Sequence, residues 1–544
     1  MVDSVISQVW PSDHFREKQH ETVKACIQAL ENGNKNIVLD APVGSGKSVV
    51  NTALLRYADD GWYTTPQKSL REQVQNDDIL ESHVENLKAR SDYTCSFTGS
   101  SCKKCSIYQD QDESCAEKNC NYWRRKQGVM NAKIAVITFS MLTVDSLIPT
   151  YVNDMQVSFD DRDMLVVDEV HSLIEQVREM HAGFDVTPYG MPDGVVGGVT
   201  DNVSWDASRF NDVKKELMKV KANCKKFYRD IPEFEMSPAE KRCKQLAEKI
   251  EQAEKDVSND YAWVVDVEGR EYGNDYVKVL EMRPIYVGNF LKNFVWSRAD
   301  KRIISTATLR YRNNPRIWIK NAGLDPEKTE VINVGMTFPP KNRPVITNET
   351  VCSMKGGGDK ENWDDIMDKL EELSKQYYGQ KGICHTSSYD RAARVEETVD
   401  VEEHPYLHNN IFVHRQHQDA DEVLDEWQDS NKDLILSPSM MEGVDLKGDL
   451  GRWNVLLKVP YPGQDAWTKY LQDETDYGWH DYYDRAAIRV AQAYGRTNRS
   501  KDDYSDFYIL DEDFEDLKKK VTLPSWFTES EGYTSVGGRS VFDY

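Results

Sequence analysis

Short apolar runs that end in polar or glycine-rich loops recur along the 544-residue chain. The clearest of these runs lie at residues 37–39, 164–167, 303–304, 382–384 and 434–436. Strands that are apolar at every position are typical of parallel sheets with helices on both faces. Charged amphipathic patterns at 214–226 and 238–258 predict two further helices. The pattern as a whole therefore predicts an α/β protein.

The loop after the first apolar run carries the sequence Asp-Ala-Pro-Val-Gly-Ser-Gly-Lys-Ser at residues 40–48. A strand, a glycine loop, a lysine and a helix start form the arrangement that cradles phosphates. Gly44, Ser45 and Gly46 would offer backbone N–H groups to a triphosphate. Lys47 would hold the β- and γ-phosphates, and the Ser48 hydroxyl would ligate Mg²⁺. We therefore expect ATP or a related nucleotide here; the alternative is a chance glycine-rich turn.

A second apolar run ends in the acidic sequence Asp-Glu-Val-His at residues 168–171. Polar groups at the carboxyl end of a parallel strand lie where doubly wound folds bind ligands. Asp168 would hold Mg²⁺, Glu169 would orient and deprotonate the attacking water, and His171 would sense the γ-phosphate. The hydroxyl residues at 305–308 fit a relay between such sites or a plain strand end, and the strand end alone is the simpler reading.

The last third of the chain carries a complementary set of polar residues. Glu-Gly-Val-Asp-Leu stands at 442–446, and Gln-Ala-Tyr-Gly-Arg-Thr-Asn-Arg stands at 492–499. Arg496 and Arg499 are three residues apart, so a helix would present both on nearly one face. Paired guanidinium groups directed at a triphosphate act as arginine fingers, with Gln492 beside them. The alternative is a pair of ordinary surface ion-pairing residues.

Composition narrows the class of protein. A chain of this length, with 39% hydrophobic and 29% charged residues, predicts several soluble domains. The net charge of −24 argues against broad coating of nucleic acid but leaves room for a local basic groove. The chain has no apolar run of the ~20 residues that span a bilayer, and residues 1–7 do not resemble a leader. We expect no membrane partner and a cytoplasmic location, nucleoid-associated, or the host cytosol if the source is viral.

These motifs occur in the order found in superfamily-two helicases, and the set most resembles the XPD/DinG family of iron–sulfur DNA helicases. The resemblance spans residues 15 to about 513. It implies two RecA-like motor domains, each a parallel sheet flanked by helices, with an iron–sulfur cluster insertion and a mainly helical Arch insertion. It also implies ATP-driven 5′→3′ movement on single-stranded DNA. Gln19 would read adenine, and Asp445 would belong to the nucleotide site.

The resemblance divides the chain into domains. The first motor would comprise residues 1–90, with the P-loop, residues 131–180, with the Asp-Glu box, and residues 296–340. The second motor would comprise residues 341–544. The cluster insertion would occupy residues 91–130, and the Arch would occupy residues 181–295.

Five cysteines fall between residues 95 and 120, which favours metal ligation over disulfides in a reduced compartment. The tight pair Cys102-x-x-Cys105 suits a [4Fe–4S] cluster, and the resemblance adds Cys95 and Cys120 as the first and last ligands. Structural zinc on Cys102, Cys105, Cys115 and Cys120 is an alternative, and unligated thiols are another.

The sequence Tyr122-Trp123-Arg124-Arg125 follows the last of these cysteines. Aromatic rings beside cations suit base stacking and phosphate contact, so these residues are candidates for nucleic-acid binding. The equally weighted alternative is an amphipathic helix whose tryptophan packs against the metal loop.

We expect the partners to be single-stranded DNA and forked duplex DNA, together with single-strand-binding, repair or replication proteins, and we expect a monomer. The motor motifs also leave open the unwinding of RNA or RNA–DNA hybrids. A further alternative is an ATP-driven translocase that displaces DNA-bound proteins.

Overall fold

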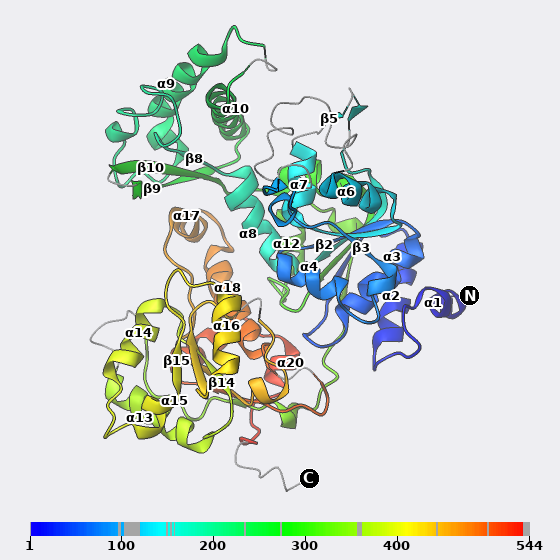
Figure 1. Ribbon diagram of the computed structural model, residues 1–544, viewed down its shortest axis with the longest axis vertical. Coiled ribbons are helices and arrows are strands. Elements are labelled where there is room, and N and C mark those ends of the chain that lie inside the picture. Colours follow the sequence, from blue (N-terminus) through cyan, green and yellow to red (C-terminus); the bar gives the residue numbers. More distant parts are fainter. Residues whose placement is uncertain are drawn as a thin grey trace.

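The computed structural model describes residues 2–95, 99–102, 120–147, 151–152, 155–156, 158–232, 236–272, 275–355, 362–441, 444–497 and 500–536. Its elements form two α/β lobes and an insertion that stands above them (Figure 1). None of the helices in these ranges is both long enough and apolar enough to cross a membrane.

Lobe one is built on a seven-stranded sheet in which every strand pair is parallel. Its strands, in spatial order, are β12 (Thr329–Asn333), β1 (Asn36–Asp40), β11 (Ala299–Thr306), β7 (Arg162–Asp168), β2 (Gly61–Thr65), β4 (Ile134–Thr138) and β3 (Glu85–Asn86). Alternate residues enter two separate cores, as Val38 and Ile37 do, so both faces of the sheet are buried. The parallel sheet predicted from fully apolar runs is therefore confirmed.

Helices cover both faces of this sheet. They are α1 (Val2–Val9), α2 (Gln19–Glu31), α3 (Lys47–Ala58), α4 (Lys68–Gln75), α6 (Asn121–Asn131), α7 (Phe139–Leu147), α8 (Leu173–Gln176), α11 (Gly288–Phe294) and α12 (Pro315–Asn321). Two short strands, β5 (Tyr151–Val152) and β6 (Met155–Gln156), pair antiparallel and lie apart from the main sheet.

Lobe two repeats the plan with six parallel strands. Their order is β13 (Val345–Ile346), β18 (Asp506–Ile509), β17 (Trp453–Leu456), β14 (Gly382–His385), β16 (Leu434–Ser437) and β15 (Ile411–Val413). Its helices are α13 (Trp363–Gln376), α14 (Tyr389–Thr398), α15 (Pro405–Asn410), α16 (Ala420–Asp429), α17 (Ala466–Glu474), α18 (Gly478–Tyr494), α19 (Asp513–Lys518) and α20 (Ser525–Thr528).

The insertion contains the two predicted helices, α9 (Phe210–Tyr228) and α10 (Pro238–Ser258). Ser237 and Glu240 form a capping box at the start of α10, which explains its sharp beginning. The insertion also contains a sheet, which the sequence analysis does not predict. An antiparallel sheet of β8 (Phe184–Val186), β10 (Asp275–Pro284) and β9 (Trp263–Tyr272) lies beneath the helices.

The predicted end of the insertion at residue 295 is also too late. Val287, Leu291 and Val295, within and around α11, pack into the core of lobe one. The insertion therefore ends near Pro284, where β10 ends, because the following helix buries its apolar side against the motor sheet.

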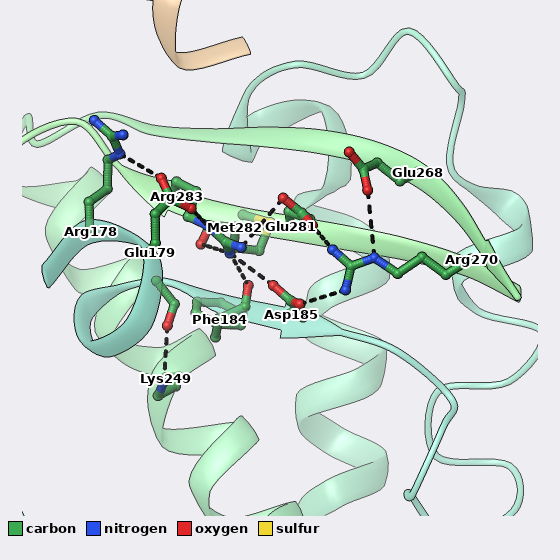
Figure 2. A network of polar contacts seen from close by, with 11 residues as sticks. Arg178, Glu179, Phe184, Asp185, Lys249, Glu268, Arg270, Glu281, Met282 and Arg283 are labelled. Atoms are coloured by element: carbon green, nitrogen blue, oxygen red, sulfur yellow. Dashed lines mark hydrogen bonds and ion pairs between the residues drawn. The ribbon is translucent and has the colours of Figure 1, made fainter. Parts of the chain in front are cut away.

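A charged network fixes the base of the insertion to lobe one (Figure 2). Arg283 on β10 contacts Glu179 at 2.8 Å and Asp185 at 2.9 Å. Arg270 on β9 contacts the same Asp185 at 3.0 Å and also pairs with Glu281. Glu179 belongs to a π-helical turn, Val177–Ala182, that continues directly from α8. The sheet of the insertion is therefore tied to the segment that follows the Asp-Glu box.

The insertion also rests on lobe two through α17. Val264 of β9 packs with Trp467 and Leu471 of α17. Asp266 accepts a hydrogen bond from the Ala466 N–H at the start of that helix, at 2.9 Å. The insertion thus contacts both lobes, as its position beside α17 in Figure 1 indicates.

Candidate nucleotide-binding site

The P-loop connects β1 to α3 as the motif predicts. Gly44 and Gly46 have φ angles of 79° and 81°, a backbone conformation that residues with a Cβ adopt poorly. A Cβ on Gly46 would lie 2.2 Å from Gln19 Nε2, so the packing also requires glycine there. Lys47 is the first residue of α3, so its side chain and the N-terminus of the helix both lie at the phosphate loop.

The Asp-Glu box faces this loop from β7. Lys47 Nζ lies 3.2 Å from Glu169 Oε1 and 3.4 Å from the Ala41 carbonyl oxygen. Glu169 has a left-handed backbone with φ 52°, which turns the chain sharply at the strand end. The structure therefore brings together the lysine and the glutamate that the sequence assigned to phosphate and water.

Asp168 is held by hydroxyl groups from the two neighbouring strands. Tyr63 Oη donates to Asp168 Oδ2 at 2.8 Å, and Ser305 Oγ donates to Asp168 Oδ1 at 2.7 Å. Asn51 Nδ2 donates to Ser305 Oγ at 2.9 Å, which links the network to α3. Ser305 thus takes the relay role that the hydroxyl run suggested, whereas Tyr63 and Asn51 were missed.

The two acids differ in their electrostatics. Burial and the adjacent Glu169 carboxylate raise the pKa of Asp168, although Lys47 opposes this. Burial also disfavours the charged form of Glu169, but Lys47 and His171 outweigh it and lower the pKa of that carboxyl. Glu169 is therefore a carboxylate at neutral pH, the form that can accept a proton from water.

His171 joins the two lobes. Its Nδ1 lies 3.3 Å from Glu169 Oε2, and its Nε2 lies 2.7 Å from Gln492 Nε2 on α18. With the amide assigned in this way, a neutral ring donates from Nδ1 to the carboxylate and accepts from Gln492 at Nε2. Thr306 Oγ1 lies 3.4 Å from the same Nδ1. One unbroken set of contacts therefore runs from Lys47 to lobe two.

Gly495 marks a second close approach between the lobes. A Cβ built on it would lie 3.1 Å from Val43 Cγ2 of the P-loop. Glycine at this position of the 492–499 motif therefore lets lobe two approach the phosphate loop closely.

The other predicted residues of lobe two contact neighbours within that lobe or lie outside the described ranges. The Arg496 guanidinium donates to the Gln492 carbonyl at 3.0 Å and to the Val444 carbonyl at 2.9 Å. Asp445 forms an ion pair with Lys447 at 3.0 Å. Arg499 lies outside the described residues, as do Glu442 and Gly443. The arginine-finger role of Arg496 and Arg499 stays a prediction.

Gln19 supports the P-loop from the start of α2. It is only 3% exposed, its Oε1 accepts from the Arg16 N–H at 2.8 Å, and its Nε2 donates to the Ser45 carbonyl at 3.2 Å. Its amide is thus placed against the loop, and the reading of adenine stays a prediction. The sequence analysis did not identify Arg312, which pairs with Asp40 of the P-loop. Both Nη atoms of its guanidinium donate to the Asp40 carboxylate, Nη2 at 3.0 Å.

Three of the four predicted cluster ligands are buried: Cys95, Cys102 and Cys120. The Cys95 N–H donates to Ser100 O and the Cys102 N–H donates to Tyr93 O, each at 2.8 Å, so the segments that carry the first two cysteines pair side by side. Cys105 and Cys115 lie outside the described residues. Within the described part of the chain, no group of three or more His, Cys, Asp or Glu side chains is placed to hold a metal ion.

The helix that follows, α6, corrects one predicted nucleic-acid residue. Trp123 is 4% exposed, so it packs inside the lobe and does not offer a face to a base. Arg125 pairs with Glu85 at 2.7 Å, whereas Arg124 is exposed and contacts Asn121. Tyr122 stacks edge-on with Tyr93. Trp123 is therefore a packed residue, and its predicted packing against the metal loop stays a prediction.

A cavity of about 450 Å³ opens between the lobes, and we name it the interlobe cavity. Lobe one supplies Gln67, at the start of α4, and lobe two supplies the rest of the lining, including Ser387, Val444, Pro460 and Arg489. Because both lobes line the cavity, any change in their separation alters its shape.

Comparisons with known proteins agree with this geometry. Residues 370–530 match the model of the helicase C-terminal domain, and residues 12–187 match that of the type III restriction enzyme res subunit. The chain is 24% identical over 255 residues to the ATP-dependent DNA helicase DinG of Photobacterium profundum. That match covers 44% of this chain but only 35% of the relative.

Two solved structures share the fold. One, described as an XPD helicase, matches with a TM-score of 0.58 and 16% identity over 94% of this chain and 98% of the other. Xpd4 of S. tokodaii matches with a TM-score of 0.56 and 14% identity over 95% of this chain and all of the other, 100%.

The P-loop and the Asp-Glu box lie in the part of the chain that the res-subunit model matches, and their glutamine partner lies in the part that the helicase C-terminal model matches. The chain is thus similar to superfamily-two helicases, to DinG in sequence and to XPD structures in fold.

Proposed function

We propose that this protein is an ATP-dependent DNA helicase that moves 5′→3′ on single-stranded DNA and unwinds duplex DNA. The observation that carries the proposal is the set of contacts Lys47–Glu169–His171–Gln492, which joins the phosphate loop of lobe one to α18 of lobe two. Through these contacts, a change at the γ-phosphate position alters the join between the lobes. A motor needs such a link to turn hydrolysis into movement.

Each residue of the site has a chemical role in this proposal. Lys47 and the P-loop N–H groups bind the phosphates, and Ser48 and Asp168 would hold Mg²⁺, which neutralises phosphate charge when bound. Glu169 orients the attacking water and accepts its proton, since its carboxyl is ionised. Tyr63 and Ser305 fix the Asp168 carboxylate, and Arg496 and Arg499 supply positive charge from lobe two.

The proposed track for the single strand crosses the interlobe cavity. Gln67 on one side and Ser387 and Arg489 on the other supply polar groups suited to a sugar–phosphate backbone. Alternating contact with the two lobes would move the strand as the cleft opens and closes. The polarity of movement is inferred from the family resemblance.

We also propose that Cys95, Cys102, Cys105 and Cys120 ligate a [4Fe–4S] cluster. The burial of three of these cysteines and the pairing of the segments that carry the first two support the assignment. Iron and zinc analysis of protein purified without air tests it. About four iron atoms per chain fit the cluster, whereas stoichiometric zinc without iron would reject it.

ATP hydrolysis with competing nucleic acids tests the substrate class. We expect single-stranded DNA to stimulate turnover and RNA of the same sequence to compete poorly. Glu169→Gln should retain ATP binding and lose turnover, because it keeps the side-chain shape and removes the proton acceptor. Stronger stimulation by RNA would redirect the proposal to RNA, and equal turnover by the variant would reject the role of Glu169.

A further inference from the structure

A group of aromatic side chains lies at the start of α18, and we name it the α18 stripe: the exposed Trp479 and the half-buried Tyr482 and Tyr483, with the half-buried Tyr461 from the loop after β17. Trp479 is 53% exposed. The rings of Tyr461 and Tyr482 stack with centroids 5.7 Å apart and planes 9° apart. Trp479 lies 6.0 Å from the ring centres of both Tyr482 and Tyr483. The rings therefore form one continuous aromatic surface.

Helical spacing aligns this surface with the interlobe cavity. Positions 479, 482 and 489 fall on one side of a helix, and Ala486, between the last two, is buried in the core of lobe two. Arg489 lines the cavity, and its Nη1 lies 3.5 Å from the carbonyl oxygen of Pro460, another lining residue next to Tyr461. From Trp479 to Arg489 the helix rises about 15 Å. The stripe thus continues the wall of the cavity along lobe two.

Trp479 is the member of the stripe with a free ring surface. Tyr461 and Tyr483 pack partly against a core of lobe two, whereas Trp479 is more than half exposed. Aromatic faces in such a setting suit the bases of an unpaired strand, because every base has a π-face and stacking tolerates any sequence. The guanidinium of Arg489, at the far end of the same side of the helix, suits a phosphate.

We propose that the α18 stripe is a second single-strand binding site, which stacks bases of the strand that passes through the interlobe cavity. The proposal rests on the function proposed above, and it adds a contact of a different kind. Stacking on neutral rings depends weakly on salt, whereas phosphate contacts release counterions and depend on it strongly. The two kinds of contact can therefore be measured separately.

The test measures the affinity of a fluorescein-labelled oligothymidylate by anisotropy over a series of salt concentrations. Trp479→Ala should weaken binding about 5-fold to 100-fold, the range for loss of one base–aromatic stack, without changing the salt slope. Trp479→Phe should restore most of the affinity. Arg489→Ala should reduce the slope by about 0.7, the value for one phosphate contact on a single strand. Tyr378→Ala, an exposed aromatic of lobe two outside the cavity lining, is the matched control and should bind normally.

A strand of the same length without bases separates stacking from folding defects. The wild type and Trp479→Ala should bind this abasic strand equally, whereas a general structural defect would weaken both strands alike and overturn the proposal. Normal oligothymidylate binding by Trp479→Ala, with weakened binding by Arg489→Ala, would reject the stripe and keep the cavity. No effect of Arg489→Ala on affinity or slope would reject the cavity as the DNA track. Loss of association with a protein partner alone would reassign the stripe as a docking surface.

Discussion

The hydrogen bond between His171 and Gln492 gives the sharpest test of communication between the lobes. The perturbation is Gln492→Ala, which removes the amide that lies 2.7 Å from His171 Nε2. A hydrogen bond of this type contributes about 0.5–1.5 kcal/mol net, which is roughly 2-fold to 12-fold in a rate or an equilibrium. Because His171 also contacts Glu169 at 3.3 Å, the loss should appear in the hydrolysis rate.

The assay is a double-mutant cycle on DNA-stimulated ATP turnover. Gln492→Ala and His171→Ala should each reduce turnover, and the double variant should be less impaired than the product of the two single effects. The expected coupling is about 0.5–1.5 kcal/mol. Gln376→Ala is the control, because its amide bonds to Tyr508 within lobe two. Strictly multiplicative single effects would refute the contact as the link between the lobes.

Further predictions concern the phosphate loop, the cysteines and a buried acid. Lys47→Ala should abolish ATP turnover because it removes the cation at the β- and γ-phosphates, and retained turnover would reject the P-loop assignment. Cys105→Ser should cost the brown iron absorbance and the unwinding activity while ATP turnover partly survives, as checked by absorbance and metal analysis. Burial raises the pKa of Asp484 to about 6, so its ionisation destabilises the folded state as pH rises from about 4 to 6. Asp484→Asn should therefore raise the free energy of unfolding at pH 7.5 by up to about 3 kcal/mol and by less at pH 5, as measured by urea denaturation at both pH values.

The motifs of the nucleotide site could be predicted because their chemistry is local in sequence. The P-loop needs glycines at fixed positions before a lysine, and Gly44 and Gly46 indeed have positive φ. The Asp-Glu pair needs the carboxyl end of a buried strand, and β7 ends at Asp168. Parallel pairing of β1, β11 and β7 then places these local features side by side.

The supporting residues could not be predicted because only tertiary packing brings them together. Tyr63 lies 105 positions from Asp168, and Ser305 lies 137 positions from it. Tyr63 lies in the middle of β2 and Ser305 lies near the end of β11, and in sequence each is equally typical of an ordinary strand residue. Trp123 was predicted to contact nucleic acid but is buried. In sequence, an aromatic residue beside arginines is as typical of a packed helix as of a base-stacking surface.

The sequence only weakly indicates the sheet of the insertion. Strands β9 and β10 pair antiparallel, and the sequence between them, Gly-Asn at 273–274, is typical of turns. The ends of both strands next to this pair are partly or fully exposed, so apolar residues do not alternate along their full lengths. The two long charged helices dominate the pattern of this region, so the sequence does not predict the strand pair.

The central claim is tested most directly by an unwinding assay. It uses duplexes with either a 5′ or a 3′ single-stranded tail, ATP, Mg²⁺ and protein purified without air. The account predicts that only the 5′-tailed duplex opens and that Glu169→Gln opens neither. Opening of only the 3′-tailed duplex would keep the motor and contradict the proposed polarity. DNA-stimulated hydrolysis without opening of either duplex would contradict the helicase proposal and favour a translocase.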